Sequence, residues 1–403
     1  MKTAGIIAEF NPFHLGHQYL IDHIRRERKA DYIIAAMSGD FVQRGEPAVF
    51  SKHLRAKAAL AVGADLVIEL PVRFSTASAE GFAMGGVQLL DSLGVVDELC
   101  FGCETPDNDA LWKAADLLLK EPALFRSVLK EELKKGRTFP KARQEALNAC
   151  PGGSALPGGL LSGPNNILAV EYVKALKKTG SPMVPVPILR QGNGYLDPDL
   201  SGPSFPSALA LRRALKTLEP DAAASVWEAH VPPGSFAVFR QALADKSWIV
   251  PEDLSLLLRY RLLSETAASL EQYADISRDL ANRIYALRLC AQGFEETAQL
   301  MKSRQLTRSH VMRGLLHILL NLKKEEPPLR YVRVLGLRRR SSGLLKSIKN
   351  QGKLPLVIKP ASSREYLSDS DSIFASDLYQ TLLSAKTGQP FKTDPRFSPV
   401  VVP

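Results

Sequence analysis

The stretch EFNPFHLGH, residues 9–17, decides how this sequence is interpreted. It follows the apolar run AGIIA at residues 4–8, which predicts a buried strand, and it leads into residues 16–29, which have the apolar spacing of a helix. Asn-Pro ends the strand, so His14 and His17 stand where the helix begins. A helix N-terminus has free N–H groups and a partial positive charge, and this position therefore favours an anion such as phosphate.

The two histidines are open to three interpretations. Their imidazoles could donate hydrogen bonds to phosphate oxygens and stabilise the charge that develops on an α-phosphate during displacement. Zinc would need a third and usually a fourth ligand, and the helical pair of metalloproteases has a spacing of four with a Glu between. They could also be two partly exposed side chains of no chemical consequence. The carboxyl end of the first strand of an α/β sheet is a ligand-binding position, which favours phosphate.

The first two hundred residues alternate strand and helix patterns. Near-continuous apolar strands separated by helices predict a doubly wound, parallel, Rossmann-like sheet with both faces covered. The prolines of the last predicted strand place it near an edge. The predicted strands are residues 4–10, 31–39, 64–71, 96–102 and 181–190, and the predicted helices include 16–29, 51–63, 78–94 and 165–178.

From residue 206 onward the pattern is mainly helical. Two further strands are predicted at residues 329–338 and 354–360, around a helix at 341–351. We therefore expect a nucleotide-binding catalytic domain over residues 1–215. A mostly helical, basic region with a small α/β element is expected over residues 216–403.

The positive charge of the chain is local. The 403 residues carry a net charge of +10, but residues 301–360 contain 15 Lys or Arg and 2 Asp or Glu, a net +13, so the remainder carries −3. Solubilising surfaces are normally mixed in sign, whereas clustering of one sign is typical of polyanion binders. This charge predicts contact with RNA or DNA. Arg338, Arg339 and Arg340 are consecutive, and we expect them to contact the nucleic-acid backbone, that of RNA if the partner is RNA, rather than to read bases.

Composition excludes several other classes. No run of eighteen apolar residues is present, and the N-terminus lacks the features of a signal peptide, so a cytoplasmic protein without a membrane span is expected. Four cysteines in a chain of this length do not predict a disulfide framework. Cys100 and Cys103 form C-x-x-C, but neither Cys150 nor Cys290 has the spacing of a partner, so no metal site is predicted.

Several motifs in fixed order resemble a known family. The stretch FNPFHLGH resembles the H-x-G-H signature of the nucleotidylyltransferase superfamily, which class I aminoacyl-tRNA synthetases share. The wider chain resembles the bacterial tRNA(Met) cytidine acetate ligase family over almost its whole length. The motifs that carry this resemblance are GIIAEFNPFHLGH, MSGDFVQRGEPAVFSKHLRAKAAL, GADLVIELP, FGCET, PNNILAVEYVKAL, SALALRRAL, VRVLGL and FSPVVV.

The resemblance implies a two-step reaction. Acetate is activated with ATP to acetyl-adenylate, and the acetyl group then passes to N4 of the wobble cytidine, position 34, of elongator tRNA(Met). Mg²⁺ is expected because pyrophosphate is a highly charged leaving group. No feature of the sequence itself identifies acetate, so this substrate rests on the resemblance alone.

The resemblance also implies the site. His14, His17 and Asp40 are the expected catalytic residues. One of Asn165 and Asn166 is expected to cap the helix that they open. The expected nucleotide contacts are Ile7, Glu9, Asn11, Pro12, His14, Gly16, His17, Leu20, Gly102, Asn165, Arg190, Gln191, Ser207 and Arg212.

Three of these assignments have alternatives. Asp40, in SGDFVQRGEPA, would orient substrate or would merely cap a turn. Nearby Arg44 would bind phosphate bidentately or pair with Glu46 on the surface. SFPSALALRRAL resembles the second phosphate motif of the superfamily, but Leu209 stands where the family usually has a hydroxyl, and Arg212 could instead face solvent.

Two functions of other classes compete with the ligase. The first is a cofactor-forming nucleotidylyltransferase that acts on a small phosphorylated substrate, although such a substrate needs no basic region. The second is a non-catalytic RNA-binding protein that keeps the sheet as a scaffold. The joint presence of His14, His17, Asp40 and Arg212 argues against the latter.

Overall fold

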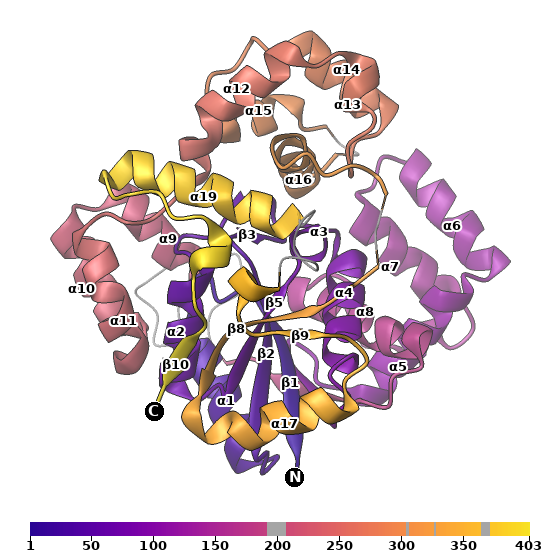
Figure 1. Ribbon diagram of the computed structural model, residues 1–403. Coiled ribbons are helices and arrows are strands. Elements are labelled where there is room, and N and C mark those ends of the chain that lie inside the picture. The colour runs from indigo at the N-terminus through magenta and orange to yellow at the C-terminus, as the bar shows by residue number, and fades with distance from the viewer. Residues whose placement is uncertain (192–206, 304–305, 326–327, 364–370) are drawn as a thin grey trace.

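A central, mainly parallel sheet with helices on both faces forms the body of the molecule (Figure 1). The computed structural model describes residues 1–191, 207–303, 306–325, 328–363 and 371–403. The doubly wound sheet predicted from the sequence is confirmed. Its N-terminal strands are β1 (Thr3–Ala8), β2 (Tyr32–Ser38), β5 (Leu66–Leu70), β6 (Glu98–Cys103) and β7 (Val184–Leu189).

The strand order is β10-β8-β5-β2-β1-β6-β7. From β1 the chain winds outward through β2 to β5, and it then returns to the other side of β1 to add β6 and β7, all in parallel. The winding direction therefore reverses between β1 and β6, which is where an open α/β sheet forms a crevice at its carboxyl edge. Strand β7 lies at the edge of the sheet, as its prolines predict.

Strands from the C-terminal half complete this sheet. Strand β8 (Val332–Arg338) pairs antiparallel with β5, β10 (Val400–Val402) pairs parallel with β8, and the short β9 (Leu356–Val357) also pairs with β8. We expected β8 and β9 to belong to a separate small element, and this was wrong. All five residues of β5 are buried, so the strand needs a neighbour on its outer side, and β8 supplies it.

A buried ionic cluster holds the C-terminal strands in place. Lys52 Nζ lies 2.7 Å from Glu69 Oε1 and 3.1 Å from Asp394 Oδ1. Arg333 of β8 pairs with both of these carboxylates. The four side chains are at most 4% exposed, and they join α2 (Lys52–Val62), β5, β8 and the 3-10 turn η5 (Asp394–Arg396). Breaking one buried pair would leave an uncompensated charge.

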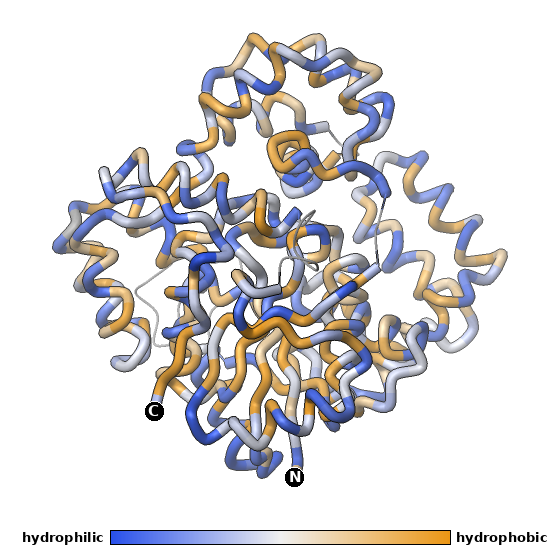
Figure 2. Tube along the Cα trace, in the orientation of Figure 1, coloured by the Kyte–Doolittle hydropathy of each residue, from blue (hydrophilic) through white to orange (hydrophobic). Residues whose placement is uncertain are grey.

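Alternating residues of each strand enter two cores, one on each face of the sheet. Ile33, Ala35 and Met37 of β2 face one side, whereas Ile34 and Ala36 face the other. The strands are accordingly among the most hydrophobic parts of the trace (Figure 2).

The first face carries α1 (Leu15–Arg26), α2, α10 (Pro220–His230) and α11 (Pro233–Ala244). The second face carries α4 (Ala79–Asp91), α5 (Asn108–Lys120), α8 (Pro164–Thr179) and α17 (Ser342–Gln351). Beside α5, α6 (Ala123–Lys134) packs on α7 (Phe139–Ala149).

A helical unit with its own core lies beyond the carboxyl edge of the sheet, at the top of Figure 1. It comprises α12 (Ser255–Ser264), α13 (Ala267–Leu270), α14 (Arg278–Leu287), α15 (Phe294–Met301) and α16 (Arg308–Leu319). Helix α19 (Asp371–Thr387) adds Ala375 and Tyr379 to this core, which also receives Phe41 and Val72 from the sheet domain. The helical unit therefore packs directly over the ligand-binding edge.

The expected boundary at residue 215 does not coincide with the division between these cores. Trp227 and Phe239, from α10 and α11, are fully buried against Phe50 in the core of the sheet. The helical unit begins only near Ile249, and the chain returns to the sheet at β8. Within the described residues, no helix has the length and apolar content needed to span a membrane.

Candidate active site

The N-terminus of α1 is built from the two predicted histidines. His14 is the N-cap residue, and its Nδ1 accepts a hydrogen bond from the Gly16 amide at 3.0 Å. The His14 amide in turn donates to Nδ1 of His17 at 3.2 Å, which closes a reciprocal capping box. Because both Nδ1 atoms accept backbone N–H groups, a neutral ring carries its proton on Nε2. Both imidazoles are therefore set as Nε2–H donors.

Both rings are neutral at physiological pH. Burial, with the charges of Arg190 and Arg212 nearby, lowers the pKa of His14 to about 3. Burial, His14 and Arg190 hold the pKa of His17 well below its ordinary value. The ring centroids are 3.9 Å apart, so a second positive charge at this distance would be strongly repelled. The histidines therefore supply hydrogen bonds, and the arginines supply the positive charge.

A cleft opens beside the histidines at the switch point between β1 and β6. Its open space, counted together with the solvent at its mouth, is about 480 Å³. Of the residues predicted to contact nucleotide, the cleft is lined by His14, Gly16, His17, Leu20, Gly102, Arg190 and Gln191. It is also lined by Tyr19, Ile188 and Leu189, which we did not predict. Helical spacing alone could have indicated Tyr19, because it lies one turn from Gly16.

Arg190 is fixed at the end of β7 by two neighbouring segments. Its amide donates to the carbonyl of Cys103 at 3.0 Å, and its Nη1 donates to Oδ1 of Asn165 at 3.3 Å. Gly102 leaves room for this side chain, since a Cβ there would lie 3.0 Å from Arg190 Cγ. Arg190, which lines the cleft, therefore contacts Asn165, which is outside the lining, and a nucleotide contact by Asn165 stays a prediction.

The expected helix cap by an asparagine was wrong. The N-cap of α8 is Gly163, and both asparagines lie in the first turn. The first turn is capped by Glu104, whose carboxylate accepts from the amide of Asn166 at 2.7 Å and from the amide of Asn165 at 3.3 Å. Asn166 turns the other way, and its Oδ1 accepts from the amides of Glu104 and Thr105.

A second arginine reaches the same region from α9 (Ala208–Thr217). Ser207 is the N-cap of this helix, and its Oγ accepts from the Ala210 amide at 3.2 Å. Arg212 Nη1 donates to the carbonyl of Asn11 at 2.7 Å, and Nη2 lies 3.6 Å from Glu46 Oε2. Arg212 thus faces the end of β1 and not solvent. Leu209 is half-buried in the first turn of the helix.

Four predicted contacts lie at the end of β1 but not in the lining of the cleft. Glu9 accepts a hydrogen bond from the Gln43 amide at 3.0 Å, and burial raises its pKa. Asn11 accepts from the Val49 amide through Oδ1, while its Nδ2 is buried without a partner. Pro12 follows it through a cis bond and is buried. Ile7 packs on α4, where its Cδ1 would lie 2.6 Å from a Cβ at Gly86.

Asp40, which we expected to be catalytic, does not line the cleft, and its catalytic role stays a prediction. It is 3% exposed, and its Oδ1 accepts from the Lys52 amide at 2.7 Å, at the start of α2. Its Oδ2 accepts from the Ser376 hydroxyl of α19 at 2.6 Å. Both oxygens are therefore engaged away from the cleft. The short hairpin that follows, β3 (Phe41–Val42) and β4 (Glu46–Pro47), packs against α3 (Val72–Ser75) and α16.

Arg55 is a buried residue that sequence reasoning missed. Its guanidinium donates to four backbone carbonyls, those of Phe50 at 2.9 Å, Glu9 at 2.6 Å, Ser38 at 3.1 Å and Gly39. Two of the segments that it joins are the carboxyl ends of β1 and β2. The segment HLRAKAAL also carries His53 and Lys57, so the sequence does not single out Arg55 for this role.

The two cysteines of the C-x-x-C motif face opposite sides of β6. Cys100 belongs to the core of one face and Cys103 to the core of the other, as their odd spacing in a strand requires. Burial raises the pKa of each thiol to about 12. The pair therefore cannot bind one metal ion together.

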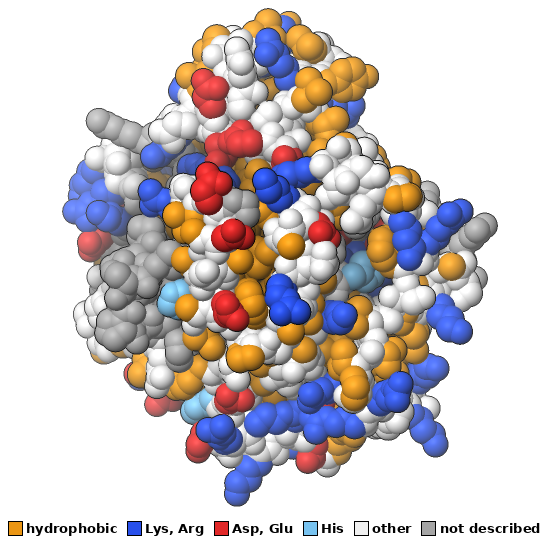
Figure 3. Space-filling view, turned by 90° about the vertical axis from the view of Figure 1, so that its left-hand side faces the viewer, with side chains coloured by type: hydrophobic (Ala, Val, Ile, Leu, Met, Phe, Trp, Pro, Cys, Tyr) orange, Lys and Arg blue, Asp and Glu red, His pale blue; other side chains and the backbone are white. Residues whose placement is uncertain are grey.

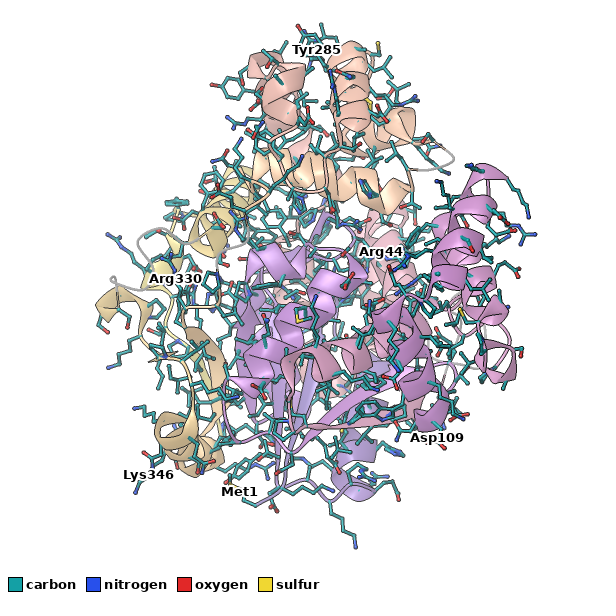
Figure 4. All side chains as sticks on the ribbon, turned by 90° about the vertical axis from the view of Figure 1, so that its right-hand side faces the viewer. Met1, Arg44, Asp109, Tyr285, Arg330 and Lys346 are labelled. Atoms are coloured by element: carbon teal, nitrogen blue, oxygen red, sulfur yellow. The ribbon has the colours of Figure 1, made fainter. Side chains whose placement is uncertain are left out.

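The three consecutive arginines lie at the far edge of the sheet from the cleft. Because β8 runs antiparallel to β5, Arg338 ends β8 beside the amino end of β5, and Arg339 and Arg340 continue into η3 (Arg339–Ser341). Arg340 Nε is 2.7 Å from Oδ1 of the fully buried Asp65. Lys and Arg side chains gather along the lower rim in Figure 3, and Lys346 in Figure 4 lies at that end, far from the labelled Arg44. RNA contact by these arginines stays a prediction.

Known proteins of one family match this chain over nearly its whole length. A family model described as HIGH Nucleotidyl Transferase matches residues 1–394. Curated relatives named tRNA(Met) cytidine acetate ligase include one from Thermoanaerobacter sp. (strain X514), 40% identical over 94% of this chain and 95% of the relative. Another, from Acetivibrio thermocellus, is 35% identical over 94% of each chain.

Two solved structures of Thermotoga maritima TmcAL match over the full length of both chains at 29% identity. The apo form I superposes with a TM-score of 0.91, and a form bound with alpha-thio ATP with a TM-score of 0.88.

Proposed function

The chain belongs to the HIGH nucleotidyl transferase family and, within it, to the tRNA(Met) cytidine acetate ligases, and on that premise we propose that it activates acetate with ATP and acetylates N4 of the wobble cytidine, position 34, of elongator tRNA(Met). The observation that carries this proposal is the N-terminus of α1, where two neutral Nε2–H imidazoles lie close enough to Arg190, and His14 to Arg212, for those charges to act on them. That a related structure is described with a bound ATP analogue supports ATP as the nucleotide.

The first step needs donors at the α-phosphate and positive charge at the leaving group. A carboxylate oxygen of acetate attacks the α-phosphorus, the bond to the bridging oxygen breaks, and pyrophosphate leaves. His14 and His17 donate to phosphate oxygens whose negative charge grows in the transition state. Arg190 and Arg212 offset the charge of the triphosphate.

The second step transfers the acetyl group. The exocyclic amine of the cytidine attacks the carbonyl carbon of acetyl-adenylate, the bond from that carbon to the phosphate oxygen breaks, AMP leaves, and the amine loses a proton. We expect the target base to enter the cleft singly, because the bases of a single-stranded anticodon loop can be splayed out.

Mg²⁺ would reach the site with the triphosphate. In the described part of the chain, His, Cys, Asp and Glu do not form a group of three that could hold a metal ion. Mg²⁺ commonly keeps several waters and binds substrate phosphates, so it can enter the site bound to ATP without a dedicated set of protein ligands. When bound, the ion would neutralise charge on pyrophosphate.

The function is tested by two measurements on the purified protein. Exchange of labelled pyrophosphate into ATP should require acetate, and mass spectrometry of digested elongator tRNA(Met) should show N4-acetylcytidine only when ATP and acetate are both present. Exchange that needs a phosphorylated small molecule instead of acetate would indicate a cofactor-forming enzyme. Tight tRNA binding without any exchange would indicate a non-catalytic RNA-binding protein.

A further inference from the structure

Glu104 lies close to the cleft, and its carboxylate has no part in the reaction proposed above. Glu104 follows β6 directly, two residues after Gly102 of the cleft lining. Six hydrogen bonds join Glu104 and Thr105 to Asn165 and Asn166 in the first turn of α8. These two segments are sixty-one residues apart in sequence, and the contact brings the end of β6 against the residue that holds Arg190.

Glu104 fixes the orientation of the Asn165 amide. Its Oε1 accepts from Nδ2 of Asn165 at 2.7 Å, so the amide oxygen points the other way and accepts from Nη1 of Arg190 at 3.3 Å. If the amide were rotated by half a turn, its NH₂ group would face the guanidinium, donor against donor. The carboxylate therefore determines which group of Asn165 meets Arg190.

Glu104 also occupies the N-terminus of α8. Its two oxygens accept from the amides of Asn165 and Asn166, which would otherwise be free to bind an anion beside the cleft. Gly163 makes room for it, since a Cβ there would lie 2.8 Å from Glu104 Oε2 and 2.9 Å from Cδ. With this helix end filled by a carboxylate, phosphate is directed to other helix N-termini, and that of α1 is one whose residues line the cleft.

We propose that Glu104 is a positioning residue for the nucleotide, acting through Asn165 on Arg190 and directing the triphosphate to the histidines. The proposal rests on the nucleotide-binding function proposed above. It concerns binding geometry and not chemistry, so loss of Glu104 should weaken ATP binding more than it slows turnover at saturation. It also predicts that the direction of the Glu104–Asn165 hydrogen bond matters, and not only its presence.

The test variant is Glu104→Gln, which keeps the shape but sets an NH₂ group against a donor. ATP affinity by calorimetry and the KM for ATP in acetate-dependent exchange should both weaken by about tenfold, the scale of removing one charge-assisted hydrogen bond, with kcat changed less. The matched control is Asp107→Asn, which removes a carboxylate on the same loop that caps α5 at Ala110 and should leave both values unchanged.

A reversed pair separates orientation from stability. Adding Asn165→Asp to Glu104→Gln restores a donor–acceptor match and should recover part of the ATP affinity. Unchanged ATP affinity and KM in folded Glu104→Gln would overturn the proposal, as would a loss confined to the melting temperature or to kcat. If the wild-type protein shows no acetate-dependent exchange but binds ATP, the proposed reaction fails while the calorimetry still decides the role of Glu104.

Discussion

Replacing Gly16 by alanine should separate catalysis from stability. Gly16 is the second residue of α1, and a Cβ there would lie 2.9 Å from His14 Cε1 and 3.1 Å from Nδ1. Ordinary carbon contacts are about 3.5–4.0 Å, so the imidazole would have to move by about 0.6–1 Å. The hydrogen bond from the Gly16 amide that fixes its tautomer would be broken or lengthened. A misplacement of about 1 Å in a catalytic group can cost about 100-fold in rate.

The stability effects of this substitution nearly cancel. Loss of a side-chain cap costs about 0.5–2 kcal/mol, whereas alanine is favoured over glycine in a helix by about 1 kcal/mol. The free energy of unfolding should therefore change by about 1 kcal/mol or less, while the rate of acetate-dependent pyrophosphate exchange falls about 100-fold.

A matched control is available on another helix. Gly343 is the second residue of α17, and a Cβ there would meet nothing within 4 Å. Gly343→Ala should leave exchange unchanged and the melting temperature equal or slightly higher. A folded Gly16→Ala protein with wild-type exchange would refute the reasoning, since it would show that the orientation of His14 does not matter to the chemistry.

Four further outcomes are expected. His17→Ala should fold normally and lose about two orders of magnitude or more of adenylate-forming exchange, because a transition-state donor is removed. Elemental analysis should find no stoichiometric zinc, in the wild type or in Cys103→Ser. Burial alone would raise the pKa of Asp394, but the charges of Lys52 and Arg333 outweigh burial and hold that pKa low. The stabilisation that ionised Asp394 gives the fold is therefore present above the unfolded-state pKa of about 3.9 and is lost as pH falls below that value. Asp394→Asn should cost about 3–5 kcal/mol in denaturant unfolding at pH 7, and it should weaken the dependence of stability on acid pH. Neutralising residues 338–340 together should lower the slope of log tRNA affinity against log salt by about 0.7 to 0.9 for each phosphate that these arginines neutralise in the wild type, and an unchanged slope would show that they face only solvent and Asp65.

The parts of the site that could be predicted are those with local signals. The start of α1, with His14, Gly16 and His17, depends on a strand end and a helix start that are adjacent in sequence. The edge position of β7 follows from its prolines, which cannot donate to a neighbouring strand. Resemblance to a family extended this local knowledge to Gly102 and Arg190, which do line the cleft.

The parts that could not be predicted depend on contacts between distant segments. Asp40 has the sequence context of a catalytic loop, but Ser376, 336 residues away, occupies one of its oxygens. The sequence around Glu104 does not indicate its contacts, because these are made with the first turn of α8. Strand β8 looks like part of a separate element because its pairing with β5 crosses more than two hundred and fifty residues. In each case tertiary contacts, and not local propensity, decide the environment of the residue or strand.

The basic stretch of residues 301–360 shows the same effect for charge. Five of its basic side chains pair with carboxylates outside the stretch: those of Arg308, Arg313, Arg333, Arg340 and Lys353. The excess of positive charge in this part of the sequence is therefore partly neutralised by carboxylates from other parts of the chain. The arginines at 338–340 also lie across the sheet from the cleft, at least about 20 Å away, which is the length of a six-residue strand. A tRNA whose wobble base enters the cleft can meet them only with a distant part of its backbone. Such an interaction adds affinity without orienting the reacting amine, so removing it should raise the KM for tRNA and leave the acetylation rate at saturating tRNA unchanged.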